Sequence, residues 1–192
     1  MLPFELGINI ALSADKMIYR NQTFNNFVYS LNGNTQTFSI SDSDRGNLLA
    51  TLTKDNIKYA LDIQLNQFVM KRKIFQRKMP LNISDTTVTA EIKLKTYGKI
   101  AHDIINNLSG TFDISMIGGY VEGFGFSNFY ASAPSITMLN AENALDSALT
   151  SGTTPLKKLH IVGTYANGDI NTSIPFTLTM PHVDAKGTMT II

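Results

Sequence analysis

The sequence predicts a mainly β protein with two helices (an α+β fold): a curved antiparallel sheet forming an open β-groove, with the helices packed at one face or end. Apolar and polar residues alternate in segment after segment, which is the period of a strand with one apolar side. Only two segments place apolar residues at helical spacing. The 192 residues suffice for one large domain or two small ones with a real core.

The alternation is clearest at residues 57–65, where apolar side chains occupy every second position: Ile57, Tyr59, Leu61, Ile63 and Leu65. The same period predicts strands at residues 6–14, 88–94, 112–116, 174–180 and 189–191. Because nearly every segment has one apolar side, we expect an antiparallel sheet with one apolar and one polar face.

Turn signals separate these segments at residues 32–34, 42–47, 54–56 and 166–169. The pair Asn167–Gly168 has the clearest mechanism, because both residue types accept the positive φ of a tight hairpin turn. The glycines of residues 118–125 follow a strand pattern, and they predict a bent or bulged strand and not a phosphate-binding loop.

Two helices interrupt the strands. The first is expected at Lys99–Leu108, with Gly110 as its stop signal, and the second at Ile136–Thr150. Their apolar residues form stripes: Ile100, Ile104, Ile105 and Leu108 in the first, and Met138, Leu145 and Leu149 in the second. An amphipathic helix beside a sheet with one apolar face is expected to cover that face or to close one end of it.

The composition narrows the classes of function. A formal net charge of +1 gives no whole-chain argument for a nucleic-acid partner, and the absence of cysteine excludes disulfides and thiolate metal sites. No secretory signal is evident, and no stretch approaches 18 apolar residues, so the sequence predicts no membrane-spanning helix. The chain is therefore expected to be either cytosolic or a piece of a longer protein.

No grouping of residues indicates a reacting centre. His102, His160 and His182 lie far apart without the partner spacing of a zinc site, and no G-x-S-x-G nucleophile motif is present. We therefore predict a protein that is not an enzyme, with no catalytic residue, no metal and no cofactor.

One local excess of charge occurs in the segment MKRKIFQRKMP at residues 70–80. Its cations are Lys71, Arg72, Lys73, Arg77 and Lys78. Contact with anionic phosphates, either of lipid headgroups or of nucleic acid, is one interpretation. A solvated strand edge is the other, since lysines at an edge prevent edge-to-edge pairing.

The apolar side of the predicted sheet supplies candidates for a lipid-binding groove. They are Ile8, Ile10, Leu12, Ile57, Leu61, Ile63, Val88, Ile92, Leu94, Phe112 and Ile114. For each of these residues the competing interpretation is an ordinary core position, packed by the two helices and holding no ligand.

Most of the chain resembles the C-terminal region of AsmA-like proteins. A helix is followed by the turn Leu108-Ser109-Gly110, a strand and a glycine segment with Gly119, Val121 and Gly123. A second helical excursion leads to Thr154-Pro155-Leu156, Leu159, Gly163 and Gly168. The end of the family pattern is matched by Gly187, Met189 and Ile191. The family's usual Asp after the glycine segment is absent, because Phe126 or Ser127 occupies its place.

The resemblance implies that residues 1–192 are a single AsmA-like C-terminal module of a longer envelope protein of diderm bacteria. Such proteins form a long β-groove in the periplasm, are anchored in the inner membrane by an N-terminal helix, and contribute to outer-membrane biogenesis and phospholipid movement between membranes. The implied partners are phospholipid and, through the anchor that this chain lacks, the membrane. The alternative is a structural β-sandwich, such as a virion or surface interaction module, without a lipid role.

Overall fold

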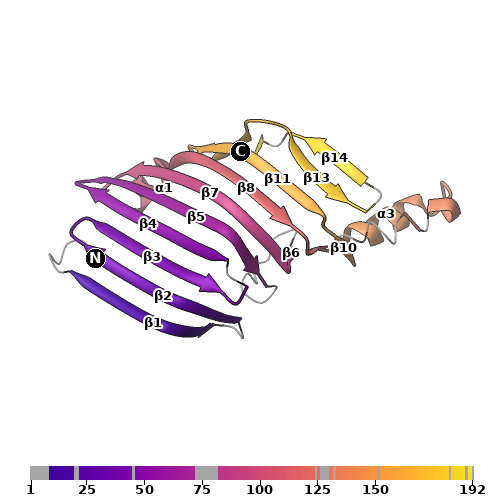
Figure 1. Cartoon of the computed structure of the whole chain (residues 1–192). Coiled ribbons are helices and arrows are strands. Elements are labelled where there is room, and N and C mark those ends of the chain that lie inside the picture. Colours follow the sequence, from indigo (N-terminus) through magenta and orange to yellow (C-terminus); the bar gives the residue numbers. More distant parts are fainter. Residues whose placement is uncertain are drawn as a thin grey trace.

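A computed structural model describes residues 9–19, 22–44, 46–71, 82–123, 125, 130–131, 133–150, 152–181, 183–188 and 190–191. In these residues twelve strands form one large antiparallel sheet, and three short strands, β10, β9 and β6, form a second sheet (Figure 1). The path of the large sheet runs from β1 at one edge to β15, and these two strands do not pair, so the sheet is not closed. The predicted fold class is confirmed.

The elements follow one another in a meander with one long excursion. The large sheet contains β1 (Ile10–Tyr19), β2 (Gln22–Asn32), β3 (Thr35–Asp42), β4 (Asn47–Asp55), β5 (Lys58–Met70), β7 (Thr86–Tyr97), β8 (Ser109–Ile117), β11 (Lys158–Ala166), β12 (Asp169–Thr172), β13 (Phe176–Met180), β14 (Val183–Gly187) and β15 (Thr190–Ile191). The small sheet contains β6 (Asn82–Ser84), β9 (Tyr120–Glu122) and β10 (Thr153–Pro155). The helical elements are α1 (Ala101–Asn106), the 3₁₀ turn η2 (Ala133–Ser135) and α3 (Ala141–Thr150).

The sheet divides at β11. The first residues of this strand, Lys158–His160, pair with β13, whereas its last residues, Gly163–Ala166, pair with β12. Its other edge pairs with β8 over its whole length. The β11–β12 hairpin turns at Asn167 and Gly168, with φ values of 54° and 93°, which confirms the predicted turn.

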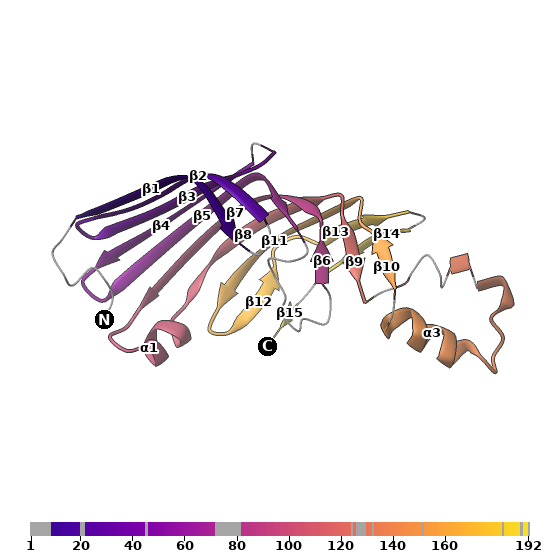
Figure 2. The same ribbon diagram turned by 90° about the horizontal axis from the view of Figure 1, so that it is seen from below.

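The large sheet has one apolar and one polar face, as the alternation predicts, because directly paired residues point to the same side. On the apolar face, Leu61 pairs with Leu52 and Leu94, and Ile63 pairs with Ala50 and Ile92. Figure 2 shows the sheet as a curved layer with α1 and β12 on its inner side. Thr96, which lies on the apolar face, donates a hydrogen bond of 2.5 Å to the carbonyl oxygen of Ile104 in α1, so the apolar face is the inner one.

Two β-bulges keep the apolar residues on the inner face. The register between β2 and β3 shifts between Asn25 and Val28, and that between β5 and β7 shifts between Leu65 and Phe68. Within these intervals Asn26 and Gln67 adopt φ values of 51° and 48°. An extra residue in one strand bends it and increases its twist, so the bulges contribute to the curvature of the sheet.

Two buried clusters form the core. One contains Phe24, Ile40 and Phe68 from β2, β3 and β5. The other contains Val121, Leu156 and Leu159, where the small sheet meets β11. Phe24 and Phe68 stack with ring centroids 6.0 Å apart and 8° between their planes. Each cluster combines residues from strands that are not all consecutive in the chain.

The helices differ from the prediction in length and in burial. The first helix spans Ala101–Asn106, shorter than Lys99–Leu108, and Ile100 and Ile105 are 61% and 63% exposed. The second begins at Ala141 and not at Ile136, and Met138 is fully exposed. Figures 1 and 2 show α3 extending away from one end of the sheet. The expected apolar stripes therefore do not cover the inner face, because the connections hold both helices at the ends of strands.

Candidate functional site

The inner rows are the first candidate surface. We use this name for two cross-strand lines of residues on the apolar face of β4, β5, β7 and β8. One line contains Leu52, Leu61, Leu94 and Gly110, and the next contains Ala50, Ile63, Ile92 and Phe112. Each of these residues is half-buried. A half-buried apolar row across four neighbouring strands offers a continuous apolar surface with room for further contacts.

Burial changes along the strands. Val88, in the same strand as Ile92 and Leu94, is 2% exposed, and Phe68 in β5 is 4% exposed. The strand ends near these two residues are packed as a core, whereas the inner rows are not fully covered. Among the candidate groove residues, Val88 therefore lies at the closed end and the inner-row residues lie on the more accessible part of the face.

The structure brings most of the remaining groove candidates onto the same face. Ile114 lies on the apolar side of β8, half-buried beside Phe112. Ile10 and Leu12 lie on the apolar side of the edge strand β1, where Leu12 is 55% exposed. Ile57 lies in the turn between β4 and β5 and not in a strand. Ile8 lies outside the described residues.

The structure describes only one residue of the predicted basic cluster. Lys71 is exposed and directly follows β5. Arg72, Lys73, Arg77 and Lys78 lie outside the described residues.

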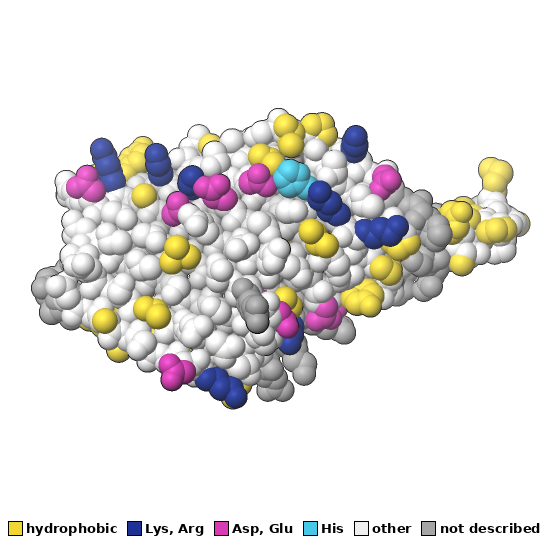
Figure 3. All heavy atoms as spheres, in the orientation of Figure 1, with side chains coloured by type: hydrophobic (Ala, Val, Ile, Leu, Met, Phe, Trp, Pro, Cys, Tyr) yellow, Lys and Arg dark blue, Asp and Glu magenta, His cyan; other side chains and the backbone are white. Residues whose placement is uncertain are grey.

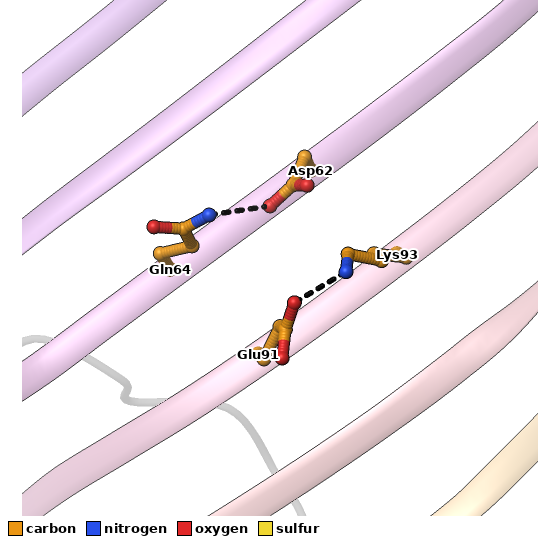
Figure 4. A network of polar contacts seen from close by, with 4 residues as sticks. All are labelled: Asp62, Gln64, Glu91 and Lys93. Atoms are coloured by element: carbon orange, nitrogen blue, oxygen red, sulfur yellow. Dashed lines mark hydrogen bonds and ion pairs between the residues drawn. The ribbon is translucent and has the colours of Figure 1, made fainter.

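The outer face of the large sheet is the second candidate surface. Figure 3 shows it covered mostly by uncharged polar side chains, with acidic and basic side chains gathered over β5, β7 and β8. Asp62 pairs with Lys93, and Gln64 pairs with Glu91, across β5 and β7. Lys93 forms an ion pair with Glu91, and Gln64 donates a hydrogen bond of 3.4 Å to Asp62 (Figure 4).

This network raises the pKa of one lysine. The hydrogen bond and the charge of Glu91 raise the pKa of Lys93 above its ordinary value of 10.5, and the charge of Asp62 acts in the same direction. The network therefore favours the charged form of Lys93, and with one lysine and two carboxylates it carries a formal charge of −1. Sequence reasoning missed it, although its members occupy the polar positions of the same alternating segments that predicted the strands.

The histidines do not form a shared site in the described part of the chain. His160 lies 2.9 Å from an oxygen of Asp113 on the neighbouring strand β8, and its side chain is one-third exposed. His102 lies 2.9 Å from the Asn106 amide within α1. His182 lies outside the described residues. Within the described ranges, no group of three His, Cys, Asp or Glu side chains is arranged to hold a metal ion.

Comparison of the chain with protein-family models, with curated proteins and with solved structures finds no match. None of the helices in the described segments has the length and apolarity needed to cross a lipid bilayer.

Proposed function

We propose that this chain is a non-enzymatic lipid-handling module whose inner apolar face holds the acyl chains of phospholipids. In this proposal it contributes to envelope biogenesis by moving phospholipid between the inner and outer membranes, as part of a periplasmic protein anchored in the inner membrane. The envelope location depends on the sequence resemblance to AsmA-like proteins alone. The acyl-chain site depends on the residues of the inner rows.

The observation that carries the proposal is the half-buried state of the inner rows. Leu61, Ile63 and Ile92 sit at the middle of a large curved sheet, and such positions in an ordinary core are almost fully buried. Burying each methylene of an acyl chain against them would contribute about 0.8 kcal/mol. A lipid chain therefore gains several kcal/mol on such a surface, even after the costs of ordering it. No covalent chemistry is needed.

Lipid retention tests the proposal. The protein is purified gently from an envelope-bearing host and analysed by native mass spectrometry and by lipid extraction. We expect bound phospholipid in the wild type and a strong loss in Leu61→Asp, because a carboxylate on the apolar face is costly to bury beside acyl chains. Leu49→Asp is the matched control: Leu49 lies on the outer face of the neighbouring strand β4, where it is 37% exposed, and this variant should retain lipid.

A second variant covers the case in which Leu61→Asp does not fold. Ile63→Thr keeps a β-branched side chain in the strand but adds a hydroxyl to the inner face, so it should fold and hold less lipid. A wild-type protein that carries no phospholipid and takes none from vesicles of phosphatidylethanolamine and phosphatidylglycerol would contradict the proposal. That result would favour a structural module whose apolar face contacts protein.

A further inference from the structure

A depression of about 340 Å³ lies at the end of the large sheet where β5 begins and β7 ends. Its lining includes Lys58, Lys95 and Tyr97. Tyr97 pairs directly with Lys58 across the two strands, and Lys95 lies two residues before Tyr97, so all three side chains point to the outer face. Figure 3 shows basic, acidic and hydrophobic side chains gathered at this end of the outer face.

The charges of the two lysines in this depression are not balanced by ion pairs within the described residues. Neither Lys58 nor Lys95 forms an ion pair within the described segments. The direct cross-strand neighbours of Lys95 are Ala60 and Ser109, which carry no charge. Asp55 is the one carboxylate that lines the depression, and it faces Lys58 across the β4–β5 turn. The side chains that line the depression, two lysines and one aspartate, therefore carry a net positive charge.

Lys93, on the same strand as Lys95, differs from the two lysines of the depression because it forms an ion pair. Lys93 lies two residues before Lys95 on the same strand and face, yet it has Glu91 as an ion-pair partner and Asp62 opposite it. Lys58 and Lys95 are diagonal neighbours across β5 and β7, where long side chains still reach one another, so their like charges repel. An anionic ligand at Lys58 and Lys95 would remove this repulsion.

The rest of the lining suits a ligand with a compact anionic group and an attached carbon skeleton. The hydroxyl groups of Thr53 and Ser109 border the depression, and Tyr97 is 54% exposed, which leaves its ring and hydroxyl accessible. The amide of Asn107, which follows α1, donates a hydrogen bond of 3.1 Å to the Tyr97 carbonyl oxygen and holds this end of β7 in place.

We infer that the depression at Lys58, Lys95 and Tyr97 binds a phosphate ester. The two ammonium groups contact the phosphate oxygens, since lysine binds phosphate as a point charge, and the hydroxyl groups donate further hydrogen bonds. The carbon skeleton of the ester lies against the Tyr97 ring. The source of the phosphate is either a soluble ester or a phospholipid headgroup, and the site does not depend on whether acyl chains occupy the inner face.

Titration calorimetry at low ionic strength tests the inference, with three probes: inorganic phosphate, glycerol 1-phosphate, and dihexanoyl phosphatidic acid below its micelle concentration. We expect at least one probe to bind, and the double variant Lys58→Gln/Lys95→Gln to bind it about tenfold or more weakly, because each charged hydrogen bond contributes at least that factor. Lys158→Gln is the matched control, because Lys158 is an exposed lysine on the same outer face, on β11.

The pattern among the probes identifies the source. Comparable binding of glycerol 1-phosphate and the short-chain lipid indicates a soluble ester, whereas binding of the lipid alone indicates a headgroup. Amide chemical-shift changes should centre on Lys58, Lys95 and Tyr97. The inference is wrong if none of the probes binds, or if the double variant binds as tightly as the Lys158→Gln control. Because the probes are short or lack acyl chains, these outcomes are separate from lipid retention on the inner face.

Discussion

The Oδ2 atom of Asp42 accepts a hydrogen bond of 2.6 Å from the backbone N–H of Val69, which lies 27 residues later in the chain. Its Oδ1 atom accepts two more, both of 2.8 Å, from the backbone N–H groups of Asp44 and Gly46. Asp42 is 2% exposed. One buried carboxylate thus ties the turn between β3 and β4 to the strand segment that follows the bulge in β5.

Replacing this carboxylate tests its role in stability. An amide at position 42 can accept the two bonds of the turn, but its NH₂ group then faces the N–H of Val69, and a donor is left without an acceptor. We expect Asp42→Asn to lower the free energy of unfolding by about 1–3 kcal/mol. Urea denaturation measures the change. Asp44→Asn, at an exposed residue of the same turn, should change the free energy of unfolding little. Equal losses of stability in the two variants would argue against a stabilising role for the Asp42–Val69 hydrogen bond.

Two phenylalanines of the same sheet distinguish a closed core from an accessible face. Phe68 is 4% exposed and stacks on Phe24, whereas Phe112 in the inner rows is half-buried. We expect Phe68→Ala to cost about 3–5 kcal/mol of unfolding free energy and Phe112→Ala about 1–2 kcal/mol, because less apolar area is lost. Chemical denaturation of both variants checks this. Equal costs would mean that the inner rows are packed as fully as the core.

Gly163 fixes the position of a ring in the inner rows. It pairs with Phe112 across β8 and β11, and a Cβ atom at this position would collide with the Phe112 ring and with the Asn171 carbonyl oxygen. We expect Gly163→Ala to displace the ring and to destabilise the fold by about 1–3 kcal/mol. Thermal unfolding and the aromatic NMR signals of Phe112 report the two effects. Thr164→Ala, at the exposed neighbouring position, should leave both unchanged.

The ion pair of the outer face predicts a pH dependence at the alkaline end. The pKa of Lys93 in the folded protein is raised above 10.5, chiefly by Glu91. A raised folded-state pKa stabilises the fold fully at pH values below the unfolded pKa, and this contribution is lost as the pH rises through the folded value. NMR titration should show the pKa of Lys93 falling toward 10.5 in Glu91→Gln. An unchanged pKa would exclude Glu91 as its cause.

The sequence by itself determined the strands around residues 57–65, 88–94 and 112–116, the polar and apolar sides of these strands and the turn at Asn167–Gly168. These features are local, because side chains alternate with a period of two and a tight turn requires residues that accept positive φ. The bulge in β5 also leaves a local signal: Leu65 and Phe68 share the inner face at a spacing of three where regular alternation gives two. This spacing is visible in the sequence.

Only the tertiary structure decided which apolar residues form a closed core and which lie on an accessible face. Val88 and Ile92 occupy equivalent positions in one alternating strand, yet the first is buried and the second half-buried. The pairing of strands far apart in sequence also placed Asp42 beside Val69, and Lys58 on the same outer face as Lys95. Burial and the approach of charges depend on which distant strands become neighbours and on how the sheet curves, and no local period encodes either.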